Sequence, residues 1–95
     1  MVITFQIDKI ERSLYRAAAL RGNAEVTMPE VYSSIEEAIR KEAAAVPEGF
    51  AYFANVTYGG ASSGTISLST LPARAAQVAD QLVAIVAEMH HIAGS

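Results

Sequence analysis

The segment Gly60-Ala-Ser-Ser-Gly64 matches the G-x-S-x-G pattern in which a serine serves as a catalytic nucleophile. That use needs a strand before the serine and a helix after it, within a sheet far larger than 95 residues can build. Here a run of alternating residues follows the motif, and the Gly-Lys-Ser/Thr of a phosphate-binding loop is missing. The pattern therefore predicts a hairpin loop, and we expect no nucleophile in it.

The two histidines, His90 and His91, are the next candidates for chemistry. Adjacent helix residues point about 100° apart, so the two imidazoles do not converge on one metal ion. Glu88 and His91 could supply two ligands, but no further cluster completes a site. The chain has no cysteine, which excludes zinc–thiolate sites, iron–sulfur clusters and a cysteine nucleophile. We expect no metal and no cofactor.

Charge and hydropathy limit the classes of partner. The net charge is −3, and the basic residues Lys9, Arg12 and Arg16 are interleaved with acids, so we expect no nucleic-acid site. No apolar stretch reaches 18 residues, so we expect no membrane span. The first residues lack the basic and apolar regions of a signal peptide, and a cytoplasmic location is the expectation that remains.

The stretch from Gly49 to Ala73 carries no charged residue and predicts one long β-hairpin. Pairing residue 58 with 64, 56 with 66 and 54 with 68 brings the apolar faces together and leaves a five-residue loop, Gly59 to Ser63. Tyr52 and Tyr58 then share the inner face, and the other face is neutral and rich in hydroxyls. Exposed strands usually carry charge against sticking to other strands. This face is therefore either merely polar or covered by a partner or ligand. The candidate interface or ligand residues of the hairpin are Phe53, Asn55, Thr57, Ser67 and Ser69 on this face and Tyr58 on the inner face.

The remaining elements follow from periodicity and caps. A strand is predicted from Val2 to Asp8, and a helix from Lys9 to about Arg21, with Asp8 and Glu11 as a capping box. A second helix is predicted from the N-cap Thr27 to about Ala45, with Val31 on its buried stripe. A third runs from Thr70 to about Ile92 and is apolar around most of its girth, apart from a narrow strip that includes Asp80.

The order β-α-α-β-β-α indicates an α+β two-layer sandwich, with a small three-stranded sheet and a long C-terminal helix, as one domain over residues 1–95. No base is paired with a nucleophile, so we expect a non-catalytic domain. Its charge-poor second half favours association, as a homodimer or a protein-interaction module, through the third helix, the outer hairpin face or the sheet edge. The alternative is a small-molecule binder or enzyme that uses Tyr52, Tyr58 and Asn55, at a subunit boundary.

Overall fold

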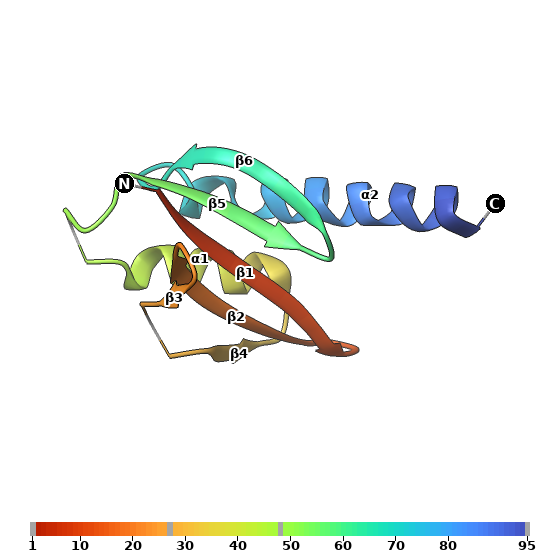
Figure 1. Ribbon diagram of the computed structural model, residues 1–95, viewed down its shortest axis with the longest axis horizontal. Coiled ribbons are helices and arrows are strands. Elements are labelled where there is room, and N and C mark those ends of the chain that lie inside the picture. Colours follow the sequence, from red (N-terminus) through yellow and green to blue (C-terminus); the bar gives the residue numbers. More distant parts are fainter. Residues whose placement is uncertain (1, 27, 48, 95) are drawn as a thin grey trace.

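The computed structural model describes residues 2–26, 28–47 and 49–94, with side chains described as far as Met89. Figure 1 shows a curved sheet with two helices against it. The elements in chain order are β1 (Val2–Glu11), β2 (Leu14–Arg21), β3 (Ala24–Glu25), β4 (Glu30–Tyr32), α1 (Ile35–Ala45), β5 (Phe53–Tyr58), β6 (Ala61–Ser67), a 3₁₀ turn (Pro72–Arg74) and α2 (Ala75–Gly94).

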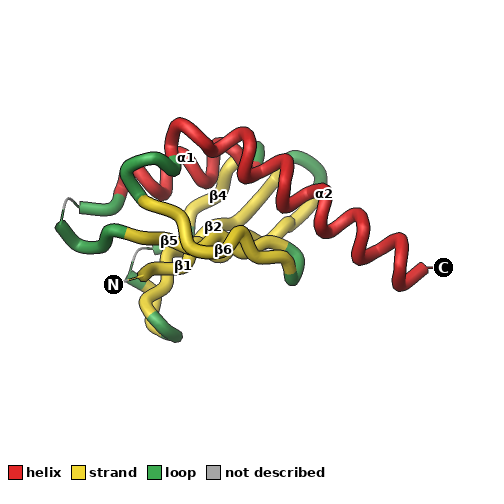
Figure 2. Tube along the Cα trace, turned by 90° about the horizontal axis from the view of Figure 1, so that it is seen from above, coloured by secondary structure: helices red, strands yellow, loops and turns green. Residues whose placement is uncertain are grey.

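The sheet has the strand order β3-β2-β1-β5-β6, with β4 beside β2 on the same edge as β3. All pairs are antiparallel except β1 and β5, which are parallel and are connected through α1. Both helices lie over one face of the sheet, as Figure 2 shows from above. The predicted α+β class and the C-terminal helix are confirmed, whereas the sheet has six strands in place of the predicted three.

The core lies between the sheet and the helices and is built on the odd-numbered residues of β1. Ile3, Phe5 and Ile7 are at most 1% exposed. Ala17 and Ala19 of β2 lie directly opposite Ile7 and Phe5 in the register. Their small side chains leave room for α1 to approach β2 closely. The helices complete the core, chiefly through Ile35, Ala38 and Ile39 of α1 and Val78 and Leu82 of α2.

The helix predicted between Lys9 and Arg21 is wrong. This segment continues β1, turns at Arg12 and Ser13 and returns as β2, with Ser13 at a positive φ of 60°. Its apolar residues fit both a helical and an alternating spacing, and pairing with β1 selects the strand. Asp8 is therefore a strand residue and not an N-cap, and the basic residues do not share a helix face.

The second predicted helix begins later than expected. The pattern Ser/Thr-x-x-Glu occurs at Thr27 and again at Ser33 and Ser34, and the helix uses Ser34 as its N-cap. The Ser34 hydroxyl accepts a hydrogen bond of 3.1 Å from the backbone N–H of Glu37. Thr27 lies outside the described residues. Val31, predicted to be buried, is in β4 and is 52% exposed.

The hairpin is confirmed, but its register differs from the prediction by two residues before the bulge and by three between the bulge and the turn. Asn55 pairs with Thr65 and Phe53 with Ser67, and the turn consists of Gly59 and Gly60. A bulge shifts the register between Asn55 and Thr57, and within it the Val56 N–H donates to the Ser63 hydroxyl at 3.0 Å. The shift of two before the bulge keeps Phe53, Asn55 and Ser67 on their predicted face.

Helix α2 extends past the sheet at its C-terminal end, as Figure 1 shows. Val78 and Leu82 are fully buried, Ile85 and Val86 are half-buried, and Met89 is 42% exposed. Asp80 is exposed, as its place among polar neighbours predicted. The side chains of His90 and His91 lie outside the described residues, so the expected absence of a metal site there remains a prediction.

The two-glycine turn between β5 and β6 packs against α2, which gives a test of the fold. A Cβ atom on Gly59 would lie 3.0 Å from Cγ2 of Val86, whereas one on Gly22 would meet nothing within 4 Å. Both glycines have positive φ, so alanine costs about 1–2 kcal/mol of backbone strain at either position. We expect Gly59→Ala to lower the free energy of unfolding, measured by urea denaturation, by more than Gly22→Ala does. Equal losses would show that the turn does not pack against α2.

Candidate functional site

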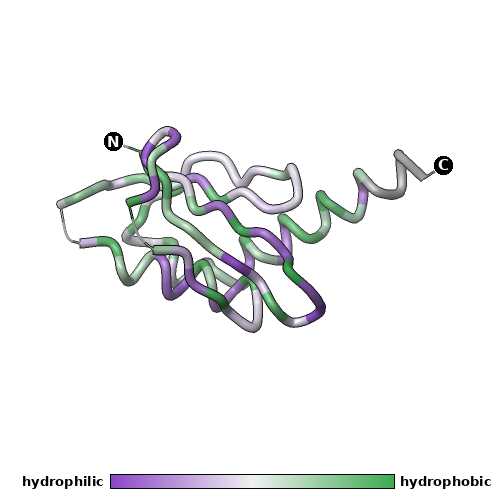
Figure 3. Tube along the Cα trace, turned by 60° about the horizontal axis from the view of Figure 1, so that its bottom comes forward, coloured by the Kyte–Doolittle hydropathy of each residue, from purple (hydrophilic) through white to green (hydrophobic). Residues whose placement is uncertain are grey.

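The face of the sheet opposite the helices, here called the outer face, carries three uncharged rows of side chains. The register places them across the strands as Val2–Phe53–Ser67, Leu20–Thr4–Asn55–Thr65 and Ala18–Gln6–Thr57–Ser62. Charge appears only at the margins, with Asp8 and Arg16 in the next row and Glu25 beside Leu20. In Figure 3 the β6 strand and its turn are pale, whereas the turn between β1 and β2 is strongly hydrophilic. The outer face is therefore a neutral surface with a charged border.

The outer face combines apolar exposure with fixed polar groups. Val2 and Phe53 are adjacent in the register and are each 46% exposed. The Ser62 hydroxyl donates to Oδ1 of Asn55 at 2.7 Å, which holds the amide in place at the centre of the face. A pre-ordered side chain loses little entropy when a partner covers it. The outer face is thus suited to contact with a partner.

The predicted site residues fall into two groups. Phe53, Asn55, Thr57 and Ser67 come together on the outer face. Tyr58 is on the opposite face, where it packs against the core and its ring centroid lies 6.1 Å from that of Tyr15. Ser69 lies beyond the end of β6, and its hydroxyl is 2.9 Å from the Ser67 hydroxyl.

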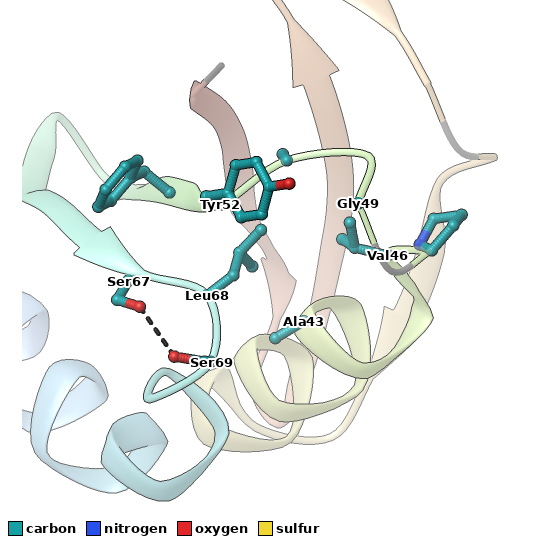
Figure 4. A pocket seen from close by; sticks show the side chains of 10 residues that line it. Ala43, Val46, Gly49, Tyr52, Ser67, Leu68 and Ser69 are labelled. Carbon is teal, nitrogen blue, oxygen red and sulfur yellow. Dashed lines mark hydrogen bonds between the residues drawn. The ribbon is translucent and has the colours of Figure 1, made fainter.

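A hollow of about 310 Å³ lies beside the start of β5 and the end of β6, and we call it the sheet-end hollow. Figure 4 shows Tyr52 beside it, with the Ser67–Ser69 contact on one side and Val46 on the other. Tyr52 is 66% exposed and does not share a buried face with Tyr58 as predicted. Tyr58 lines a different hollow, beside the β5–β6 turn, and Asn55 lines neither. The three residues that the ligand-binding alternative relies on are therefore separate.

One polar group that the sequence reasoning missed is the buried carboxyl of Glu42 in α1, which is 4% exposed. The Tyr32 hydroxyl donates to its Oε2 at 3.2 Å, and Oε1 has no hydrogen-bond partner among the described residues. Burial raises the pKa of Glu42, and burial beside this carboxylate raises the pKa of Tyr32 to about 12. The sequence spacing indicates that Glu42 is on the buried side of the helix, because it follows the buried residues Ala38 and Ile39 by four and three positions.

Comparison of the chain with protein-family models, curated proteins and solved structures found no significant match. Among the described residues, no group of three or more histidine, aspartate or glutamate side chains is arranged to hold a metal ion. Within the same residues, no helix is both long and apolar enough to span a membrane. Functional inference therefore rests on the geometry of the surfaces described above.

The raised pKa of Glu42 predicts a specific pH dependence of stability. The folded state holds the Glu42 proton to a higher pH than the unfolded state, whose pKa is near the ordinary 4.5. The free energy of unfolding therefore loses a favourable contribution as the pH rises through the folded pKa. Glu42→Gln removes this titration, so we expect the variant to gain stability relative to the wild type as the pH rises above 4.5.

Urea denaturation at several pH values measures this difference. Glu36→Gln is the matched control, because the Glu36 side chain is 41% exposed and pairs only with Arg40 at 3.4 Å among the described residues. If the wild type and Glu42→Gln change in parallel with pH, then Glu42 does not titrate differently in the folded state.

Proposed function

We propose that this protein acts by association and that it forms a homodimer through the outer face of its sheet. The observation that carries the proposal is the set of three uncharged rows, with exposed Val2 and Phe53 at one end. A solvated sheet face normally carries charged side chains that keep other strands away. A face that lacks them over four adjacent strands is suited to contact with another protein surface.

The two edges of the sheet are less suited to association. The β6 edge carries the bulge at Ser63 and Gly64, and a bulge twists an edge out of the geometry that strand pairing needs. The other edge is divided between β3 and β4, two strands of two and three residues that carry Glu25 and Glu30. Short, charged edge strands resist pairing with a second chain.

The protruding part of α2 is the remaining surface that the sequence indicated. Val83 is 48% and Met89 42% exposed, but exposed Asp80 and Glu88 lie on the same helix. The turn at Gly59 and Gly60 also approaches the Val86 and Met89 side chains and covers part of the apolar stripe. The outer face is therefore the larger uninterrupted neutral surface.

The size of the outer face sets the expected strength of the dimer. Four strands and three rows span roughly 15–20 Å in each direction, from the usual strand spacing and rise. This area is below the roughly 800 Å² per partner of a standard stable interface. We expect a dimer with a dissociation constant in the micromolar range and not a permanent assembly.

A charge placed on the outer face tests the proposal. Thr65 is exposed and makes no side-chain hydrogen bond among the described residues, so Thr65→Lys leaves the protomer intact. In the dimer the new ammonium would be taken out of water without a partner, which costs free energy. We expect the dissociation constant, measured by sedimentation equilibrium, to rise at least about tenfold, which corresponds to about 1.4 kcal/mol.

Gln81→Lys is the control for net charge, since Gln81 is an exposed residue of α2 and lies far from the outer face in the fold. It should dimerise as the wild type does. A wild type that stays monomeric at several hundred micromolar, or a dimer weakened equally by both variants, contradicts the outer-face dimer.

The second candidate function is the binding of a small neutral molecule in the sheet-end hollow. It is supported by the hollow itself, which brings Phe53, Ser67 and Ser69 together beside the exposed ring of Tyr52. With indole as the probe, NMR titration should shift the amide signals of residues 67–69, and Tyr52→Ala should weaken binding severalfold by removing the stacking surface. Shifts elsewhere, or an unchanged affinity in Tyr52→Ala, would argue against this site.

A further inference from the structure

A second hollow, of about 380 Å³, lies between β4 and α1, and we call it the acidic hollow. It is separate from the outer face and from the sheet-end hollow, and it shares no lining residue with the latter. Its lining contains both carboxylates and aliphatic residues: Met28, Glu30, Val31, Tyr32, Glu37, Lys41, Glu42 and Ala45.

Glu42 is the feature that separates this hollow from an ordinary charged surface. Its side chain is almost completely buried, and only one of its two oxygens is hydrogen-bonded within the part of the chain that the structure describes. A buried carboxyl oxygen without a donor is costly, and such atoms are rare in folded proteins. Because Glu42 lines the hollow, a donor bound there would lie beside this carboxyl group.

The charges around Glu42 specify the kind of donor. Glu30 from β4 and Glu37 from α1 line the same hollow, and both raise the pKa of the Tyr32 hydroxyl, as Glu42 does. Lys41 is the one cationic side chain in this lining, and it forms no ion pair with them among the described residues. Three carboxyl groups against one ammonium leave the hollow acidic, so a positively charged donor is favoured over a neutral one.

The chemistry of the lining distinguishes a metal ion from an organic cation. The described residues provide no cluster that could hold a metal ion, and the lining also contains the apolar residues Met28, Val31 and Ala45. A primary ammonium on a short aliphatic chain matches both kinds of lining residue. Its N–H groups donate to carboxylates, and its methylenes contact the apolar residues.

We propose that the acidic hollow is a binding site for a primary alkylammonium group, with Glu42 Oε1 as the central acceptor and Glu30 and Glu37 as flanking charges. Tyr32 holds the other oxygen of Glu42 and so fixes the direction of the acceptor. Lys41 acts as the internal competitor, since it is a cationic residue that lines the same hollow.

The site has a pH signature. The pKa of the empty Glu42 is raised by burial and by Glu30, and Tyr32, Glu37 and Lys41 are the other ionisable groups that line the hollow. An ammonium ion favours the ionised carboxylate, so binding displaces a proton from Glu42 and affinity rises with pH through the pKa of the free protein.

The experiment is an NMR titration of the intact chain with n-butylammonium chloride at constant ionic strength, with 1-butanol and magnesium chloride as parallel probes. For the wild type we expect saturable shifts at the side-chain carboxyl of Glu42 and at the amides of residues 30–32 and 41–45. Glu42→Gln should weaken n-butylammonium binding at least about tenfold, and Lys41→Ala should strengthen it. Glu36→Gln changes a half-buried carboxylate of the same helix that does not line the hollow, and it should leave the affinity unchanged.

Three outcomes overturn the proposal: equal affinity in the wild type and Glu42→Gln, shifts by 1-butanol as strong as those by n-butylammonium, or magnesium ions that bind more tightly than the amine and also depend on Glu42. Folding of each variant is checked by urea denaturation. If Glu42→Gln does not fold, Glu30→Gln and Glu37→Gln carry the test, and each should weaken binding severalfold. Unchanged affinity in both would overturn the proposal.

Discussion

The parallel pairing of β1 with β5 is the constraint on which the rest of the structure depends. Two parallel neighbours cannot be joined by a turn, so the chain must cross over one face of the sheet between them. Here α1 makes that crossing after β2, β3 and β4 have extended the sheet on the far side of β1. Helix α2 then packs beside α1 on the same face. The result is a sheet with one face covered by its own chain and the other left to the solvent or to a partner.

The sequence predicted correctly those segments whose pattern of apolar residues fits only one type of secondary structure. Residues 49–73 alternate between glycine-containing turns, and the long apolar stripe of α2 fits only a helix. The segment from Lys9 to Arg21 fits either a helix or a strand, because Ala17, Ala18 and Ala19 are compatible with both the helical and the alternating spacing. The choice between them is made by β1, which lies across from β2 in the fold. Long-range pairing of this kind leaves no local trace in the sequence.

The outer face could be predicted because a register shift by an even number of residues leaves each side chain on the same face of the sheet. The bulge opposite Val56 and the shorter turn moved the hairpin register by two, which leaves Asn55 and Ser67 on the face first assigned to them. The extension of this face onto β1 and β2 could not be predicted while β2 was read as a helix. Glu42 was missed for a related reason: its place beside Tyr32 exists only because β4 joins the edge of β2.

Strand β4 has only three residues and pairs with one neighbour, yet it supplies the hydroxyl that holds Glu42. An edge strand so weakly attached is the part of a sheet that opens most easily without unfolding the rest. Opening it would give water access to the Glu42 carboxyl, and the tendency to ionise would favour the open form more as the pH rises. The edge strand β4 and the buried carboxyl of α1 are thus linked through the single hydrogen bond from Tyr32 to Glu42.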